Sequence, residues 1–290
     1  DRLEIIELSS YTELEKCNIA MKHLVPKQLK ENGLKASQMK IDEEMILYLI
    51  RYYTRESGVR QLERVIATLC RKSVLLILKE GKRSVKISKK LIQSWLGHEK
   101  FEYGKRELKD QVGTVTGLAY TSFGGDVLQI EVNYFEGSGK LVLTGQLGDV
   151  MKESATIAYD YVKANAKQFQ IPSTLFEKHD VHIHVPDGAV PKDGPSAGIT
   201  LTTALVSALS NRAVSADLAM TGEVTLRGNV LPIGGLKEKS MAAHRCGIST
   251  IIIPKANMKD MDEIPETVKK SVKFIPVEHV SQVLHTALGK

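Results

Sequence analysis

The hydrophobic period of the sequence changes near residue 100, and this change constrains the fold more than any other feature. Before it, five residues fall on one stripe at helical spacing: Leu62, Ile66, Leu69, Ser73 and Leu76. After it, short apolar segments such as 112–122 and 126–137 are separated by glycine-rich turns, which is typical of strands. We therefore expect two domains of different architecture, which a length of 290 residues permits.

The first domain, residues 1–98, is expected to be an all-α helical bundle. Thr12 and Glu15 have the spacing of a capping box and predict that a helix begins there. Asp42 can cap a second helix, and Gly81 can end a third.

The second domain, residues 110–290, follows a polar linker at residues 99–109 that lacks clear periodicity. Its expected elements include helices at 149–168 and 196–210 and a strand at 180–186. Because strands and helices alternate without strict βαβ spacing, the pattern predicts an α+β domain with a mixed sheet.

Residues 194–211 contain no charged side chain, and this run approaches the length of a membrane span. Six serines and threonines interrupt it, so we expect a buried helix and no membrane contact. Cys17, Cys70 and Cys246 are far apart in sequence, which favours free thiols and a cytoplasmic location. The chain begins at Asp1 without methionine, and we expect it to be part of a longer protein.

The basic charge lies in the first third of the chain. Residues 1–100 carry 20 Lys and Arg against 13 Asp and Glu, whereas residues 101–290 carry 20 against 21. A solvated basic face is the simplest interpretation. The alternative is that the basic helical domain binds DNA.

Ser196 lies at the start of the charge-free helix and allows three interpretations. As a nucleophile it needs an adjacent base, and the backbone N–H groups of Ser196 and Ala197 can then stabilise the oxyanion. In this interpretation Ala197 and Gly198 leave room for a substrate backbone. Alternatively, the glycine-rich turn binds phosphate in a kinase-like domain for small molecules. From the residues alone, a helix cap is the most frequent role of such a serine.

Lys239 is the candidate base for the nucleophile interpretation. It lies about 200° around a helix from Lys237 and shares a face with Ala242 and Ala243, so we expect Lys239 to point inward. A lysine acts as a base when its pKa falls from about 10.4 to about 7–8, and burial lowers the pKa in this way. The hydroxyl of Thr221 could orient the amine without favouring its charged form.

Three segments are distinctive as a set: HIHVPDGA (182–189), PKDGPSAG (191–198) and MTGEVTLRGNVLPIGGLKEK (220–239). They resemble the proteolytic domain of the Lon family of ATP-dependent proteases, in its A branch. The resemblance extends from about residue 110 to the C terminus. It implies that Ser196 is the nucleophile, that Lys239 is the general base and that Thr221 hydrogen-bonds the lysine.

The family resemblance also implies a biological role. It indicates a serine endopeptidase that cleaves unfolded or damaged polypeptides and depends on ATP in the intact protein. It further implies homohexamers that act in protein quality control and the stress response.

The segment YTRESGVRQLER (53–64) resembles the small helical lid of the AAA+ module in the same family. The resemblance implies that Arg60 contacts nucleotide phosphates, whereas a surface arginine would pair with Glu56 or Glu63. The sequence has no GxxxxGK[ST] loop, so we do not expect this chain to hydrolyse ATP by itself. ATP or ADP with Mg would serve the intact protein, and the peptidase chemistry itself needs no cofactor.

Four further residues are candidates for supporting roles. Asp193 could hold Lys239 as an ion pair, or it could cap the helix that follows it. His182 and His184 alternate on one strand and could border the site or be ordinary strand residues. Glu131 could point toward the site or toward solvent. No residues have the spacing of a metal site, and we expect none.

Overall fold

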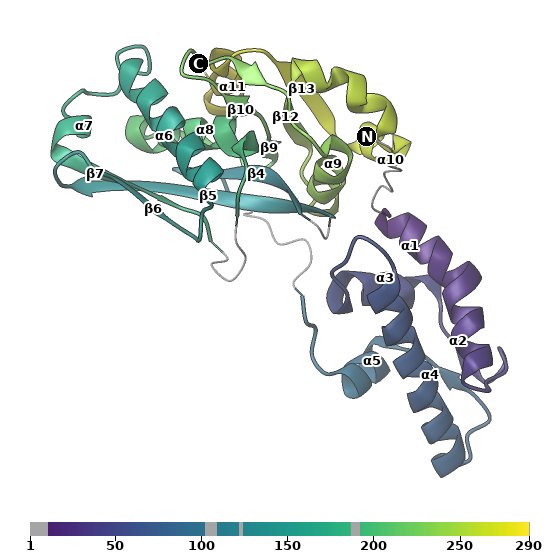
Figure 1. Cartoon of the computed structure of the whole chain (residues 1–290). Coiled ribbons are helices and arrows are strands. Elements are labelled where there is room, and N and C mark those ends of the chain that lie inside the picture. Colours follow the sequence, from purple (N-terminus) through teal and green to yellow (C-terminus); the bar gives the residue numbers. More distant parts are fainter. Residues whose placement is uncertain (1–10, 102–108, 122–123, 187–191, 290) are drawn as a thin grey trace, which may run out of the picture. The chain divides into compact units, whose positions relative to one another are not determined.

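The computed structural model describes residues 11–101, 109–121, 124–186 and 192–289. Its internal contacts divide the chain into two compact units, with the main division between residues 105 and 106 (Figure 1). We call residues 11–101 the helical unit and residues 109–121 with 125–289 the sheet unit. Most of the expected linker, residues 102–108, lies outside the described residues.

The helical unit is built from short helices joined by tight turns. Its elements are α1 (Glu13–Ile19), a π-helical turn (Ala20–Leu24), α2 (Val25–Glu31), β1 (Met39–Lys40), α3 (Glu43–Tyr53), α4 (Arg60–Glu80), β2 (Val85–Lys86) and α5 (Lys89–Leu96).

Local capping signals fix where these helices begin and end. The Thr12 hydroxyl accepts a hydrogen bond from the Glu15 N–H at 3.0 Å, and the Glu15 carboxylate accepts one from the Thr12 N–H at 2.7 Å. Asp42 accepts a bond from the Met45 N–H at 3.0 Å at the start of α3. Gly81 ends α4 at a φ of 63°, where glycine is unstrained. The three predicted caps are therefore confirmed.

The apolar stripe of α4 faces the core of the helical unit. Leu62, Ile66, Leu69 and Ser73 are fully buried, as their spacing predicts. Leu76 is only partly buried, because the last turns of α4 extend beyond the core.

The sheet unit contains the longer part of the chain. Its elements are β3 (Gln111–Val112), β4 (Thr114–Thr121), β5 (Gly124–Glu136), β6 (Leu141–Thr144), α6 (Asp149–Ala164), α7 (Leu175–Lys178), β7 (His179–His184), the 3₁₀ turn η2 (Pro195–Ala197), α8 (Gly198–Ser210), β8 (Ala213–Val214), β9 (Leu218–Met220), β10 (Glu223–Val224), β11 (Val230–Leu231), α9 (Leu236–Arg245), β12 (Thr250–Pro254), η3 (Lys255–Glu263), α10 (Glu266–Ser271), β13 (Lys273–Val277) and α11 (Val280–Leu288).

Seven of these strands form one mixed sheet in the order β13-β12-β9-β4-β5-β7-β6. The pairs from β13 to β4 are parallel, β5 pairs with β7 antiparallel, and β6 pairs with β7 parallel. The predicted α+β domain with a mixed sheet, preceded by a helical domain, is confirmed.

Helices cover one face of this sheet along its length and the other face at the end formed by β13, β12, β9 and β4 (Figure 1). On one face α6, α8 and α11 pack in a core that includes Ile252 of β12. On the other face α9 and α10 pack in a core that includes Ile251 and Ile253. Successive strand residues point to opposite faces, so neighbouring isoleucines of β12 belong to different cores.

Helix α8 is the buried helix that the charge-free run predicts. Each residue from Gly198 to Leu209 is buried. The hydroxyls of Thr202 and Thr203 donate hydrogen bonds to carbonyls one turn earlier, at 2.9 and 2.8 Å, so their polar groups are satisfied inside the core. None of the described helices has the length and apolar character needed to cross a bilayer.

Candidate active site

Ser196 lies in the turn η2, directly before α8, and its side chain is half-buried. Gly194 precedes it at a φ of 121°, a conformation that favours glycine, so the chain turns sharply there. Helix α8 has Ala197 as its N-cap residue, and no side chain caps either η2 or α8. The interpretation of Ser196 as an ordinary helix cap is therefore wrong.

The backbone of Ser196 is held against the residues that follow β9. Its carbonyl accepts hydrogen bonds from the Gly222 N–H at 2.8 Å and from the Thr221 hydroxyl at 3.3 Å. The Gly222 carbonyl accepts a bond in turn from the Ile199 N–H at 3.0 Å. These bonds fix the serine turn relative to Thr221.

Lys239 lies in the first half of α9 and is only 2% exposed. Ala242 and Ala243 on the same face are fully buried and Lys237 is half-buried, so the expected inward direction of Lys239 is confirmed. The amine donates a hydrogen bond to Thr221 Oγ1 at 3.2 Å. Burial lowers the pKa of Lys239 to about 8.

Thr221 joins the two candidate catalytic residues. Its hydroxyl proton is used in the bond to the Ser196 carbonyl, so its oxygen accepts from the Lys239 amine. A neutral amine bound in this way keeps its lone pair available for another proton. Among the hydrogen bonds of the described residues, none joins the amine to the Ser196 hydroxyl.

Asp193 lies three residues before the serine but caps a different helix. Its carboxylate accepts hydrogen bonds from the Met151 N–H in the first turn of α6 and from the Gly194 N–H, both at 2.9 Å. One interpretation expected Asp193 to cap the helix that follows it, and this interpretation is wrong. Asp193 also forms no ion pair with Lys239 in the part of the chain that the structure describes.

The two histidines of β7 share one partner. The Thr144 hydroxyl lies 2.9 Å from His182 Nε2 and 2.7 Å from His184 Nδ1. Glu131 on β5 is exposed and lies opposite His184 in the strand register. The hydrogen bonds of the described residues connect none of these three side chains to Ser196 or Lys239. The described residues also contain no cluster of side chains that could hold a metal ion.

In the helical unit, Arg60 is the exposed first residue of α4 and lines a shallow pocket with Gln28, Glu63, Arg64 and Ala67. Glu63 pairs with Lys27 at 2.7 Å, and this contact lowers the pKa of Glu63. Glu56 accepts bonds from two N–H groups in the first turn of α4. Neither carboxylate forms an ion pair with Arg60 in the described structure.

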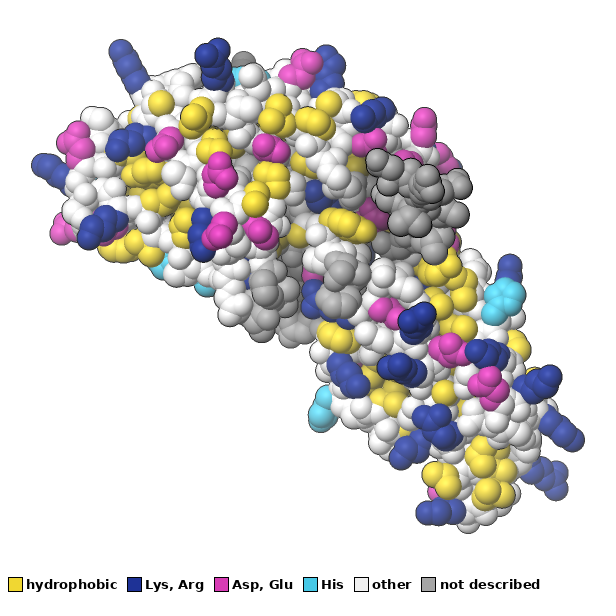
Figure 2. Space-filling view, in the orientation of Figure 1, with side chains coloured by type: hydrophobic (Ala, Val, Ile, Leu, Met, Phe, Trp, Pro, Cys, Tyr) yellow, Lys and Arg dark blue, Asp and Glu magenta, His cyan; other side chains and the backbone are white. Residues whose placement is uncertain are grey.

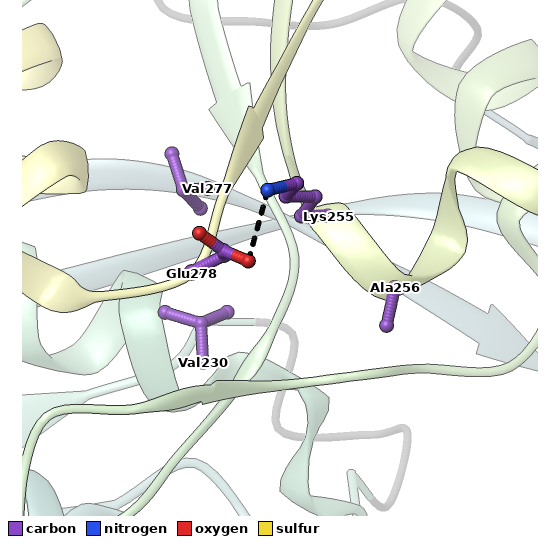
Figure 3. Close-up of a pocket in the computed structure, with 5 residues that line it drawn as sticks. All are labelled: Val230, Lys255, Ala256, Val277 and Glu278. Atoms are coloured by element: carbon purple, nitrogen blue, oxygen red, sulfur yellow. Dashed lines mark ion pairs between the residues drawn. The ribbon is translucent and has the colours of Figure 1, made fainter.

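A second shallow pocket lies in the sheet unit and is lined by Val230, Lys255, Ala256, Val277 and Glu278 (Figure 3). Lys255 and Glu278 point toward each other and form an ion pair at 3.0 Å. Both side chains are exposed, and an ion pair of this kind contributes little binding or catalytic potential. The pocket contains no residue of the Ser196–Lys239 site.

Comparison with known proteins identifies the family. The family model of the Lon protease (S16) C-terminal proteolytic domain matches residues 86–290, and that of the Lon protease AAA+ ATPase lid domain matches residues 30–89. This chain belongs to the Lon protease family. It carries a serine peptidase domain and a lid domain of the Lon type, as the sequence motifs predicted. The alternative of a kinase-like phosphate-binding domain has no support from these matches.

The Lon relatives match along the whole chain. The identity is 56% over 288 residues with Lon protease 1 of Bacillus subtilis (strain 168), 54% over 290 residues with the Lon protease of Brevibacillus choshinensis and 54% over 289 residues with that of Haemophilus influenzae. These alignments cover 99–100% of this chain and 36–37% of the relatives. The chain thus spans about a third of the length of the curated relatives that it matches.

Several packing contacts that support the Lon site escaped the sequence analysis. A Cβ on Gly198 would lie 2.6 Å from the Val224 nitrogen, so this glycine allows α8 to pack on β10. The space that a side chain at Gly198 would fill is occupied by Val224. The buried Asn257 side chain bonds both the N–H and the carbonyl of Ile233, which fixes the loop before α9. Gly125 contacts α9, and the double glycine before a strand could have indicated such a close approach.

Proposed function

We propose that Ser196 and Lys239 form the catalytic pair of an endopeptidase that cleaves unfolded polypeptides. The observation that supports this assignment best is the buried amine of Lys239, which donates a hydrogen bond to the hydroxyl that also holds the serine turn. Burial lowers the pKa of this amine to about 8, so a useful fraction is neutral near pH 7.

The reaction is acyl transfer. The neutral amine of Lys239 takes the proton of the Ser196 hydroxyl as the serine oxygen attacks the carbonyl carbon of a peptide bond. Lys239 then gives this proton to the leaving amine, and the acyl ester forms on Ser196. A water molecule, deprotonated by the same lysine, hydrolyses the ester and restores the serine.

The negative charge of the tetrahedral intermediate is stabilised by the backbone N–H groups of Ser196 and Ala197. Their place at the start of η2 and α8 supports this role, since the first N–H groups of a helix have no partner within the helix and can donate to an anion. Thr221 orients the lysine through its hydroxyl. His182, His184 and Glu131 would act indirectly, through the strands that border the site.

Substitution of the serine tests the assignment. Ser196→Ala should abolish hydrolysis of an unstructured fluorogenic peptide and also labelling by a serine-directed phosphonate. Ser173→Ala, which removes an exposed serine, is the matched control and should leave both unchanged. Hydrolysis and labelling that persist at the wild-type rate in Ser196→Ala would reject the pair.

We also propose that Arg60 contacts the phosphates of ATP or ADP with Mg in an intact, homohexameric protease. Arg60 and Arg64 both line the pocket at the start of α4, which places two guanidinium groups where a phosphate could bind. Such a protein would act in the cytoplasm, in quality control and the stress response. Arg60→Ala in the intact protease should reduce ATP-dependent protein degradation while leaving hydrolysis of a small peptide largely unchanged.

DNA binding by the helical unit is a separate proposal. Basic side chains lie over the visible face of this unit (Figure 2). Eight basic residues between positions 71 and 90 are exposed: Arg71, Lys72, Lys79, Lys82, Arg83, Lys86, Lys89 and Lys90. Binding of a fluorescent DNA duplex to the full chain should weaken steeply with added salt. It should also weaken in the triple variant Lys82→Gln, Arg83→Gln, Lys86→Gln. Negligible affinity at low salt would reject this proposal.

A further inference from the structure

The start of β5 lies directly against α9, the helix that carries Lys239. A Cβ added to Gly125 would lie 1.9 Å from the Glu238 carbonyl oxygen and 3.0 Å from the Lys239 nitrogen. Both obstacles are backbone atoms, which cannot move aside as a flexible side chain can. Position 125 therefore requires glycine, and the β5 backbone touches the peptide group that leads into Lys239.

Arg245, the last residue of α9, holds β5 in this position. Its Nη2 donates a hydrogen bond to the Gly125 carbonyl at 3.0 Å and lies 4.0 Å from the Asp126 carboxylate. The planar guanidinium can bond both groups at once, which a lysine amine does less well. One side chain thus links the C-terminal end of α9 to the residue that packs beside Lys239.

The preceding strand contacts the other end of α9. A Cβ on Gly235, the N-cap residue of α9, would lie 2.9 Å from Cγ of Tyr120 on β4. The Gly235 carbonyl accepts the hydrogen bond of the Lys239 N–H at 3.0 Å. Strands β4 and β5, which are neighbours in the sheet, therefore contact α9 on both sides of Lys239.

We propose that Arg245 is a positioning residue for the peptidase site. By holding the Gly125 carbonyl, it keeps β5 against the Glu238–Lys239 peptide and keeps the Lys239 amine beside Thr221 and out of water. This inference rests on the proposed function of Lys239 as the base. Without Arg245, β5 separates from α9 and water reaches the amine, which then holds its proton more tightly.

Burial, and not a neighbouring charge, sets the protonation of the amine in this arrangement. On α9 the other titratable or charged side chains are Lys237, Glu238, His244 and Arg245, and the surrounding elements carry Tyr120 on β4, Asp126 on β5, Glu223 on β10 and Asp193 before η2. Asp126 lies beside Arg245, and Asp193 is bonded by backbone N–H groups. No ion pair with Lys239 occurs among the described residues.

The test measures the Lys239 amine directly by carbon-13 NMR titration of the lysine side chains in the full chain. The Lys239 signal is assigned by its loss in Lys239→Arg. Arg245→Gln should raise the pKa of Lys239 from about 8 by at least about one pH unit, toward the ordinary value near 10.4. In an active preparation, kcat/KM for an unstructured peptide at pH 7 should fall about tenfold for each such unit.

Three companion variants make the test specific. Arg227→Gln removes an exposed arginine elsewhere in the sheet unit and should leave the Lys239 titration unchanged. Arg245→Lys retains a hydrogen-bond donor, so the Lys239 pKa in this variant should lie between the values of the wild-type chain and Arg245→Gln. Gly125→Ala lifts β5 from α9 without touching the arginine, and it should raise the Lys239 pKa in the same direction.

The outcomes separate this inference from the proposed function. A folded Arg245→Gln chain with the wild-type Lys239 titration would overturn the role of Arg245 and leave the catalytic pair intact. If Arg245→Gln fails to fold, Gly125→Ala decides, and a folded Gly125→Ala chain with the wild-type Lys239 titration would overturn the inference. An amine that titrates near 10.4 in the wild-type chain would overturn both the proposed base and its positioning.

Discussion

Each unit of this chain buries one lysine, and the two lysines have different partners. Lys16 of α1 is 8% exposed and Lys239 of α9 is 2% exposed, and they are the buried charged side chains among the described residues. The Lys16 amine donates a hydrogen bond to the backbone carbonyl of Glu56. The Lys239 amine donates to the hydroxyl of Thr221.

The difference lies in what else each partner holds. A neutral amine and an ammonium group can both donate to an oxygen, so neither partner by itself sets the charge of its lysine. The same Glu56 caps α4 with its carboxylate, so Lys16 ties α1 to the start of α4. The Thr221 hydroxyl donates its own proton to the Ser196 carbonyl, so Lys239 is linked to the serine turn. Among the described residues, Lys239 is thus the buried lysine that is connected to a candidate nucleophile.

The largest expected effect follows from removing the amine of Lys239. Lys239→Met should reduce hydrolysis of an unstructured peptide by about 10⁴-fold or more, since a residue that acts as a unit with the nucleophile is lost. The same change should stabilise the fold at pH 7 by about 3 kcal/mol, because a buried amine with a pKa of about 8 is costly to protonate. Peptidase assays and denaturant unfolding measure the two effects.

The stability gain has a defined pH dependence. The pKa of Lys239 is lower in the folded chain than in the unfolded chain, where it is about 10.4, so the unfolded chain binds more protons between pH 8 and 10.4. Wild-type stability should rise through this window, and the advantage of Lys239→Met should shrink there. Lys237→Met is the control. An advantage that is the same at pH 7 and pH 10 would contradict the buried, neutral amine.

Loss of the Thr221 hydroxyl should have an intermediate effect. Thr221→Val leaves the Lys239 amine without its acceptor and should lower kcat about 10- to 100-fold, since an unsatisfied buried donor costs about 1–3 kcal/mol. Thr221→Ser keeps the hydroxyl and should retain most activity. Equal rates for the valine and serine variants would show that the hydroxyl has no part in the reaction.

The pH dependence of peptide hydrolysis by the wild-type chain tests whether Lys239 is the base. Activity needs the neutral amine, so kcat/KM should rise about tenfold per pH unit below pH 8 and level off above it. Steady-state assays from pH 6 to 10 with one peptide substrate provide the measurement. A rate that is independent of pH below 8 would mean that another group is the base.

The smallest expected effect on catalysis comes from the other buried lysine. Lys16→Met leaves the Glu56 carbonyl without this donor and should destabilise the helical unit by about 1–3 kcal/mol. Hydrolysis of a small peptide should not change. Lys22→Met, at an exposed lysine of the π turn, is the matched control for unfolding measurements. Reduced peptidase activity in Lys16→Met would break the distinction between the two lysines.

Features that depend on neighbours in sequence could be predicted. The caps at Thr12, Asp42 and Gly81 follow from local hydrogen bonds and from glycine at positive φ, and the structure contains all three. The inward direction of Lys239 followed from the alanines on its face. The spacing of residues left several interpretations of Ser196 open. The family motifs then indicated that Ser196 is the nucleophile and Lys239 the base.

Features that depend on distant contacts could not be predicted in this way. Asp193 caps α6, a helix that begins more than forty residues earlier, and nothing in its own segment indicates this. The π turn at Ala20–Leu24 is different, because it directly precedes Val25 and Pro26 and so has a local mark that the sequence analysis did not use. Gly125 and Arg245 meet across 120 positions, so their contact exists only in the folded chain.

The two faces of the mixed sheet have a consequence for when the proposed catalytic pair can form. The serine turn opens α8 on one face, whereas the lysine belongs to α9, which packs on the opposite face. Neither layer alone brings both groups together, so the proposed catalytic pair forms only when α8 and α9 have both packed on the sheet. Peptidase activity should therefore appear late in the folding of this domain.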